Sequence, residues 1–406
     1  MCWCLPAMTS GMGTDAPLTT DMAFRSKSQV LMDEWGATDR ESAAKADQAR
    51  RFAPEPPIET WSTLTLPYQA PSSPPLLSWD RLRAFSVSRR IEKSLAAQRK
   101  EGEQNERLHE NAGFNSVYRF GEYVVKWGCN PKIIDEAENM LFLAEHLPRL
   151  RIPTLLAAWT VETDNKEAVF CIMMNYINGV RLNCLDQFPK MDIKAQDIIC
   201  AKVSAQIAYL HSLSLPSGEW YYGRVNRQAW VKPPPNIETF TTLPRNVTPP
   251  FTTYEEFIAA IERSTELQEA LHTFNVPYED FFPSQLERRR KLGDMLKNFK
   301  PQEPKLTWLD PKFKNMVAVP IGGNAETATD WDVFLVDLED LGWYPAWMQW
   351  LQLRARCGAL ILAPDRQSVS PHRDPEIMQM LMKDLGPNCD WEKYSALLRS
   401  VRWRFY

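Results

Sequence analysis

Two short apolar runs near the middle of the C-terminal half constrain the fold more than any other feature. Residues 316–319 (MVAV) and 333–336 (VFLV) have the composition of strands, and the Gly-Gly-Asn sequence at 322–324 favours a turn between them. In an antiparallel hairpin, the residue before the first run, Asn315, would lie next to the residue after the second run, Asp337. The pattern therefore predicts that an amide and a carboxylate meet at one edge of a sheet.

A second carboxylate precedes this hairpin. Asp310 lies five residues before Asn315 in the segment DPKFKN. Carboxylate and amide oxygens suit a hard cation such as Mg²⁺, and a further carboxylate can orient or deprotonate a hydroxyl. Phosphoryl transfer needs this combination. We therefore interpret Asp310 as the residue that orients the acceptor hydroxyl, and Asn315 and Asp337 as magnesium ligands.

An upstream hairpin and helix supply candidates for a phosphate-binding cation. Residues 117–120 and 123–126 predict two strands joined by a tight, glycine-containing turn. The helix that follows is indicated by one stripe of apolar residues, at Ile133, Ala137, Met140, Leu141 and Ala144. Lys126 ends the second strand and would contact the α- and β-phosphates of a nucleotide. Glu136 begins the helix and would hold Lys126 by an ion pair.

Each of these residues also has a simpler interpretation. A lysine that ends a strand is usually a solvated edge residue, and a glutamate in the first turn of a helix suits the helix dipole. Asp310-Pro311 is also typical of a turn, and Asp337 could cap its strand. The order along the chain favours the catalytic interpretation: strand lysine, helix glutamate, long helix, Asp310, hairpin, Asp337.

The remaining pattern predicts an α+β chain of two lobes with an N-terminal extension. Residues 1–78 are polar and end in a cluster of prolines, so we expect this extension to be largely disordered. Residues 79–177 are expected to form a small β-rich N-lobe, preceded by a charged helix from Trp79 to about Gln104. Residues 178–406 are expected to form a larger, helical C-lobe.

Further elements are predicted within both lobes. Two strand-like runs, 155–161 and 168–174, belong to the sheet of the N-lobe. In the C-lobe, a long amphipathic helix ends at His211, where a cation suits the helix dipole, so we interpret this histidine as structural. A capping box at 253–256 begins another helix, and the stretch from about residue 345 is mainly helical.

Composition narrows the functional classes. The 47 lysines and arginines nearly balance the 51 aspartates and glutamates, so the net charge of −4 gives no reason to expect nucleic acid or an anionic membrane as partner. No apolar run reaches the length of about 18 residues typical of a transmembrane helix. The eight cysteines are scattered, without a CxxC pair or zinc-like spacing. We expect a cytoplasmic protein.

Taken together, these motifs resemble the aminoglycoside phosphotransferase/choline kinase-like family, particularly its fungal branch, over residues 110–360. The segments that carry the resemblance are EYVVKWG, EAENMLFLAEH, IMMNYINGVRL, AQIAYLHSL, LTWLDPKFKNMVAV and VFLVDLEDLGWYPAW. The resemblance implies a bilobal protein-kinase-like fold that uses ATP and Mg²⁺. It also implies that the backbone of Met174, Asn175 and Tyr176 contacts the adenine.

Three positions depart from the family pattern or add to it. Trp308 stands where the family usually has a histidine, two residues before Asp310, and the loop at 113–117 is poor in glycine. Lys312 occupies the position at which serine/threonine protein kinases carry a lysine that neutralises the transferring phosphoryl group, although a solvated loop lysine is an equally good interpretation. No APE-like element follows Asp337, which disfavours a protein kinase.

The expected function is an ATP- and magnesium-dependent phosphotransferase that acts on a hydroxyl of a small molecule. Catalytic roles fall to Asp310 and Lys312, and metal binding to Asn315 and Asp337. The alternative, favoured by Trp308 and the glycine-poor loop at 113–117, is a catalytically weak or inactive kinase-like protein that binds nucleotide or ligand. The acceptor and the oligomeric state are left open by the sequence.

Overall fold

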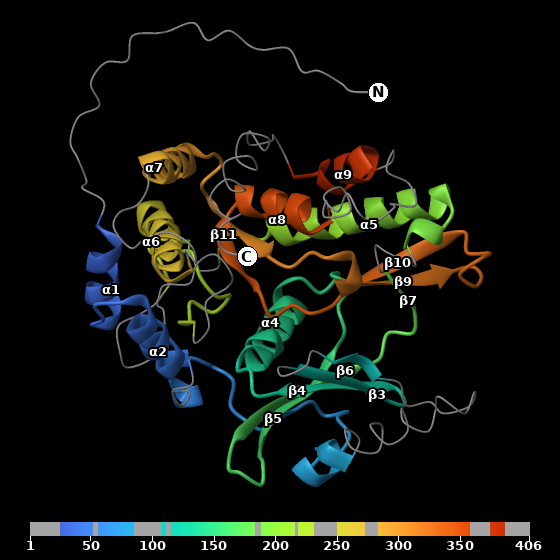
Figure 1. Cartoon of the computed structure of the whole chain (residues 1–406). Coiled ribbons are helices and arrows are strands. Elements are labelled where there is room, and N and C mark those ends of the chain that lie inside the picture. Colours follow the sequence, from blue (N-terminus) through green and yellow to red (C-terminus); the bar gives the residue numbers. More distant parts are fainter. Residues whose placement is uncertain are drawn as a thin grey trace, which may run out of the picture.

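The computed structural model describes residues 25–51, 56–84, 107–110, 115–182, 188–215, 218–230, 250–272, 283–357 and 374–385. Within these ranges the chain forms an α+β fold of two lobes (Figure 1), as the sequence predicted. The smaller lobe contains the largest sheet, and helix α4 lies between this sheet and the larger, mainly helical lobe.

The smaller lobe is built on a six-stranded antiparallel sheet with the strand order β1-β5-β6-β4-β3-β2. Its strands are β1 (Tyr68–Gln69), β2 (Arg107–Glu110), β3 (Asn115–Phe120), β4 (Tyr123–Gly128), β5 (Leu155–Glu162) and β6 (Ala168–Asn175). The predicted β3–β4 hairpin is confirmed. Its turn contains Gly121 with φ of +59°, a left-handed conformation that glycine adopts without steric cost.

Side chains alternate between two apolar layers along the central strands. Ile172 of β6 packs in the main core with helix α4 (Lys132–His146), whereas its neighbours Cys171 and Met173 pack with Leu82 on the opposite face of the sheet. This period of two is the ordinary geometry of a strand covered on both faces. The helix predicted from the apolar stripe is thus confirmed, and it covers one face of the sheet.

The larger lobe contains five described helices and two small antiparallel sheets, with the strand orders β10-β9-β7 and β11-β8. The helices are α5 (Ile193–Ser212), α6 (Tyr254–His272), α7 (Pro283–Asn298), α8 (Trp347–Cys357) and α9 (Asp374–Met382). The strands are β7 (Val180–Arg181), β8 (Pro304–Trp308), β9 (Met316–Ile321), β10 (Asp330–Leu335) and β11 (Leu341–Pro345). Helix α5 is the predicted long helix, and α8 and α9 lie in the C-terminal stretch predicted to be helical.

Polar side chains fix where two of these helices begin. The carboxylate of Asp192 accepts a hydrogen bond from the Ala195 N–H at 2.9 Å, which caps α5. At α6 the Glu256 N–H donates to Thr253 Oγ1 at 3.1 Å, and the Thr253 N–H donates to Glu256 Oε2 at 3.2 Å. This reciprocal pair confirms the predicted capping box.

The β9–β10 hairpin, on which the functional prediction depends, is also confirmed. Its register runs from Met316 opposite Leu335 to Ile321 opposite Asp330. Beyond the last pair, the Val336 N–H donates to the carbonyl of Asn315 at 2.9 Å. The backbones that carry Asn315 and Asp337 are therefore neighbours at the open end of the hairpin.

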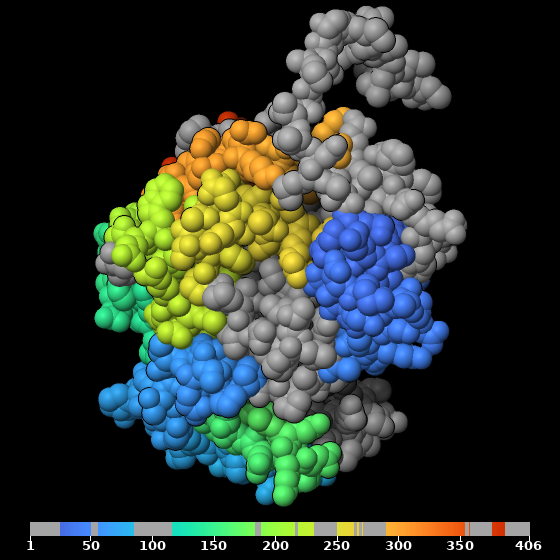
Figure 2. Space-filling model, turned by 90° about the vertical axis from the view of Figure 1, so that its left-hand side faces the viewer, coloured from blue at the N-terminus to red at the C-terminus, as the bar shows by residue number. Residues whose placement is uncertain are grey.

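The expectation of a largely disordered segment at 1–78 is wrong for its described part. This part contains helices α1 (Lys27–Trp35) and α2 (Arg40–Arg51), a 3₁₀ turn (Ile58–Thr60) and strand β1. Helices α1 and α6 lie side by side (Figures 1 and 2). The apolar cluster between them includes Val30, Leu31 and Leu267. The segment looked disordered because its short apolar faces are buried only by a helix more than 200 residues away in the sequence.

Two further predictions concern residues at the margins of the described ranges. Residues 1–24 lie outside them, as does most of the helix predicted from Trp79 to Gln104, of which only residues 79–84 are described, in helical conformation. A separate prediction concerns membrane-spanning helices. None of the helices within the described ranges has the length and apolar character that crossing a bilayer requires.

Candidate active site

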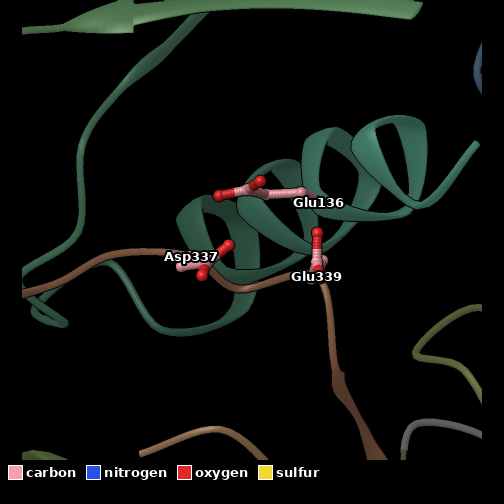
Figure 3. A group of neighbouring side chains, drawn as sticks. All are labelled: Glu136, Asp337 and Glu339. Carbon is pink, nitrogen blue, oxygen red and sulfur yellow. The ribbon is translucent and has the colours of Figure 1, made fainter. Parts of the chain in front are cut away.

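Four charged side chains converge between α4 and the segment that follows β10. The Lys126 ammonium lies 2.7 Å from Glu136 Oε2, 2.7 Å from Asp337 Oδ1 and 3.2 Å from Glu339 Oε2. Carboxylate oxygens of the three acidic residues lie within 4.8 Å of one another (Figure 3). The predicted ion pair between Lys126 and Glu136 is present, and the structure adds Glu339, which the sequence analysis missed.

The strand position of Lys126 explains why its ammonium reaches this cluster. Strand β4 lies between β3 and β6, so Lys126 is on a central strand and not at an edge. It shares a face with Val124, which packs in the main core with α4. Lys126 is only 6% exposed. The interpretation of Lys126 as a solvated edge residue is therefore wrong.

One ammonium shared by three carboxylates sets the protonation of the cluster. Burial by itself favours the neutral amine, but the charges of Asp337, Glu136 and Glu339 raise the pKa of Lys126 well above its ordinary value. Burial raises the pKa of Glu136 to about 7, although Lys126 opposes the shift. The pKa of Asp337 is lowered, because Lys126 and nearby loop lysines outweigh its burial. Of the Glu136 and Asp337 carboxylates, Asp337 is thus the one held more firmly as an anion.

Hydrogen bonds from both lobes hold the segment around Asp337. Asp337 has φ of +64°, a left-handed conformation that aspartate tolerates better than most residues. The indole N–H of Trp308 donates to the Asp337 carbonyl at 3.3 Å. On the α4 side, Asn139 Nδ2 donates to the carbonyl of Leu338 at 2.7 Å, and the Leu338 N–H donates to Glu136 Oε1 at 3.3 Å. Trp308, which departs from the family pattern, therefore supports this segment.

The loop before β9 brings together three of the predicted residues. Asn315 Nδ2 donates to Asp310 Oδ2 at 3.0 Å and to the Asp310 carbonyl at 3.1 Å. The Lys312 ammonium lies 2.7 Å from Asp310 Oδ1. Because the Asn315 amide nitrogen is used as a donor, its side-chain oxygen is the atom left to bind a cation. Lys312 pairs with Asp310, so it is not simply a solvated loop lysine.

Further cations lie near this loop. Arg181 on β7 donates from Nε to the Lys314 carbonyl at 2.7 Å. Burial lowers the pKa of Arg181, and the charge of Asp337 opposes this shift. Arg181 follows the NGV sequence in a segment with no catalytic pattern of its own. Only the pairing of β7 with β9 brings Arg181 to the site. For Glu339, the only indication of a functional role in the sequence was its position two residues after Asp337.

The predicted adenine-contacting backbone lies at the end of β6. The Tyr176 N–H donates to the carbonyl of Glu122 at 2.9 Å, and the Asn175 N–H donates to the carbonyl of Thr154 at 3.2 Å. These two N–H groups are used within the protein, so adenine contacts through them would require both bonds to break. The role of Met174, Asn175 and Tyr176 in nucleotide binding stays a prediction.

Comparisons with known proteins give weak structural likenesses. No protein-family model matches the sequence, and no match is found among curated proteins. The solved structures to which the chain is similar include a ternary complex of APH(2'')-IIa with streptomycin and ATP, at 15% identity over 77% of this chain and 88% of that chain, with a TM-score of 0.45. The ADP-bound aminoglycoside phosphotransferase APH(2'')-Ib gives 17% identity, the same two shares and a TM-score of 0.45.

A third similar structure is a choline/ethanolamine kinase family protein from Mesorhizobium loti. It gives 14% identity over 78% of this chain and 84% of that chain, with a TM-score of 0.42. Because these TM-scores lie below 0.5, none of the likenesses carries the functional assignment, which rests on the side-chain geometry.

His211 lies outside this cluster, in the last turn of α5. Burial lowers its pKa to about 4, and the charge of Lys305 acts in the same direction. Its Nε2 is buried without a hydrogen-bond partner among the described residues. The imidazole is therefore neutral near pH 7, and the expectation of a helix-capping cation at this position is wrong.

This lowered pKa predicts a loss of stability in acid. Between about pH 6.5 and pH 4, the unfolded chain binds a proton at His211 that the folded chain excludes, so stability falls as the pH decreases. We expect the free energy of unfolding to fall by about 2 kcal/mol more between pH 7 and pH 5 in the wild type than in the His211→Gln variant. Urea unfolding at both pH values measures this difference, and equal pH dependence in the two proteins would contradict it.

Proposed function

We propose that this chain is an ATP- and magnesium-dependent phosphotransferase that acts on a hydroxyl group of a small molecule. The observation that carries the proposal is the convergence of Lys126, Glu136 and Asp337 beside a loop in which Asn315 holds Asp310. Phosphoryl transfer depends mainly on positioning and on neutralisation of charge. This arrangement supplies a buried cation, oxygen ligands and a carboxylate near one another.

Each residue has a proposed role. Lys126 binds the α- and β-phosphates, because its neighbours keep it charged in a buried position. Glu136 holds Lys126 in place. Asn315 and Asp337 supply the side-chain oxygens that suit Mg²⁺, and bound Mg²⁺ would neutralise charge on the phosphates.

Asp310 is the proposed group that orients the acceptor hydroxyl or takes its proton. Its carboxylate is held by Asn315 and paired with Lys312. Lys312 would also neutralise the phosphoryl group during transfer. Together with Lys314 and Arg181, it makes the surroundings of Asp337 suited to an anionic group.

The finer assignments are proposals as well. We assign the chain to the aminoglycoside phosphotransferase/choline kinase-like family, with a protein-kinase-like fold divided into an extension at 1–78, an N-lobe at 79–177 and a C-lobe at 178–406. A cytoplasmic location suits an enzyme that uses ATP. It also suits a chain whose buried Cys171 forms no disulfide.

A catalytically inactive nucleotide-binding protein is the second candidate. Trp308 and the glycine-poor loop at 113–117 favoured it in the sequence. The hydrogen bond from Trp308 to the Asp337 carbonyl weakens the first of these grounds, since the tryptophan supports the metal-binding segment. Transfer to an acceptor, measured separately from nucleotide binding, distinguishes the two candidates.

Nucleotide binding that depends on magnesium and on Asp337 is the first test. Mg-ATP at roughly 100 times its dissociation constant adds about 2.7 kcal/mol to the stability of a protein that binds it, which raises the Tm by several degrees. We expect this rise in Tm when the wild type is given ATP with Mg²⁺. We expect no rise when the wild type is given ATP without Mg²⁺, or when the Asp337→Asn variant is given Mg-ATP. Thermal unfolding followed by fluorescence measures it.

Asp330→Asn is the matched control for this test. Asp330 lies on the same hairpin, is about half exposed and contacts Lys202 at 3.2 Å, away from the Lys126 cluster. It should respond to Mg-ATP like the wild type. A wild type that shows no Mg-ATP response, or an Asp337→Asn variant that responds fully, would refute the proposal. ADP release with a panel of hydroxylated small molecules, compared with hydroxyl-bearing peptides, then tests the acceptor class.

A further inference from the structure

Helix α4 carries two polar faces, of which the proposed function uses only one. On the first face, Lys132, Glu136 and Asn139 contact the segment after β10. On the neighbouring face lie Asp135 and Glu138, one helical turn apart and both buried. Neither carboxylate has a catalytic role, and two buried carboxylates at this spacing are costly unless they are paired.

Arg224 supplies the pairing cation. Its guanidinium contacts Glu138 and lies 2.8 Å from Asp135 Oδ1, and it is only 3% exposed. The same guanidinium donates to the carbonyl of Trp61 and, at 3.1 Å, to that of Ala229. Arg224 therefore joins α4 to the loop at 218–230 and to the N-terminal segment.

The N-terminal segment reaches Glu138 directly as well. Glu138 Oε1 accepts hydrogen bonds from the Thr63 N–H at 2.6 Å, from Thr63 Oγ1 at 2.8 Å and from Ser62 Oγ at 3.0 Å. The adjacent Trp61 is fully buried, with its ring edge-on to Phe170 of β6 at a centroid distance of 6.3 Å. Residues 61–63 are therefore fixed to α4 and β6, because one oxygen of Glu138 accepts three hydrogen bonds and the Trp61 indole is buried.

We propose that residues 61–63 and Arg224 are positioning residues that hold α4 in the orientation in which Glu136 contacts Lys126. Glu138 and Glu136 lie two residues apart on one helix, so a shift or rotation that breaks the bonds of Glu138 also displaces Glu136. The catalytic consequence rests on the function proposed above. The positional consequence does not, because it concerns only how α4 is held.

The test uses two small changes in place of the loss of Arg224, which could unfold the protein. The Ser62→Ala/Thr63→Val double variant removes two of the three donors to Glu138 and keeps the buried Trp61. Because hydrogen bonds to a charged group are strong, we expect the amides of α4 to exchange with solvent at least about tenfold faster, while α5 is unchanged. Hydrogen exchange with mass spectrometry measures both helices in one sample.

A second readout follows Lys126 itself. In the same double variant, an amine-reactive reagent applied without nucleotide should modify Lys126 several-fold faster than in the wild type. Lys27 is 1% exposed and lies on α1, so its modification rate should not change. Thr65→Val is the matched control, because Thr65 is exposed and, within the described residues, makes no hydrogen bond to α4. In this control, the modification rates of Lys126 and Lys27 should both equal those of the wild type.

Three outcomes decide the inference. The inference is supported if the double variant shows faster amide exchange confined to α4 and faster labelling of Lys126. The single variant Thr63→Ser, which keeps Ser62 and a hydroxyl at position 63, should then show wild-type values for both. Unchanged amide exchange in α4 and unchanged labelling of Lys126 would overturn it. An equal acceleration of exchange in α5 and of labelling at Lys27 would also overturn it, because it would indicate a general loss of stability. Neither readout needs activity, so failure here leaves the Mg-ATP test of the proposed function standing. If that function holds, the double variant should also show a lower kcat that Thr63→Ser restores.

Discussion

Replacement of Asp310 by asparagine is expected to slow phosphoryl transfer by about 10² to 10⁴-fold, while Mg-ATP binding changes little. Asparagine keeps the oxygen that accepts from Asn315 Nδ2, so the loop before β9 should keep its conformation. It loses the negative charge that would orient the acceptor hydroxyl or take its proton. Steady-state ADP release with an active acceptor, beside a Mg-ATP thermal shift, measures the two effects separately.

Asp332→Asn is the control for this experiment. Asp332 is on the neighbouring strand β10 and forms an ion pair with Arg151 at 3.3 Å, so the same chemical change occurs there away from the Lys126 cluster. Its turnover should match that of the wild type. If Asp310→Asn also retained full turnover, Asp310 would be a turn residue, the simpler interpretation that its Asp-Pro sequence allows.

Replacement of Lys126 by methionine is expected to lower the free energy of unfolding by about 3 to 5 kcal/mol at pH 7. The change preserves most of the aliphatic volume but leaves Glu136, Asp337 and Glu339 without their shared cation. The three carboxylates would then bind protons more readily in the folded state. The loss should therefore shrink as the pH is lowered towards 5, and urea unfolding at several pH values checks both expectations.

Lys202→Met supplies the comparison for a surface pair. Lys202 contacts Asp330 at 3.2 Å, and both side chains are more than two-fifths exposed, so its loss should cost less than about 1 kcal/mol. In the double variant Lys126→Met/Glu136→Gln, part of the stability should return, because one uncompensated carboxylate has been removed. A Lys126→Met protein no less stable than Lys202→Met would show that the buried cluster does not need its ammonium.

The sequence predicted the elements whose signals are local. The β9–β10 hairpin and the capping box at α6 follow from turn residues, apolar runs and spacings within about 25 residues. The contact between Lys126 and Glu136 follows from a strand and the helix next to it, ten residues along the chain. In each case, short-range geometry decides which atoms meet.

The features that the sequence could not predict depend on contacts between distant segments. Glu339 joins Lys126 across 213 positions, and Trp308 supports Asp337 only because β8 and the segment after β10 lie side by side. The packing of α1 on α6 brings Arg263 within 2.7 Å of Glu34, which lies 229 positions away in the sequence. The polar, proline-rich N-terminal segment contains no apolar periodicity that would have predicted this packing. Such pairings need a tertiary arrangement before either partner can be assigned.

The course of the N-terminal segment has a mechanical consequence. Helix α1 is attached to α6 in one lobe, and β1 adds an outer strand to β5 in the other. The stretch of chain between α1 and β1 is therefore a second covalent connection between the lobes, besides the backbone that follows β6. Once this connection is fully extended, any further separation of its two ends requires either the α1–α6 packing or the β1–β5 pairing to break.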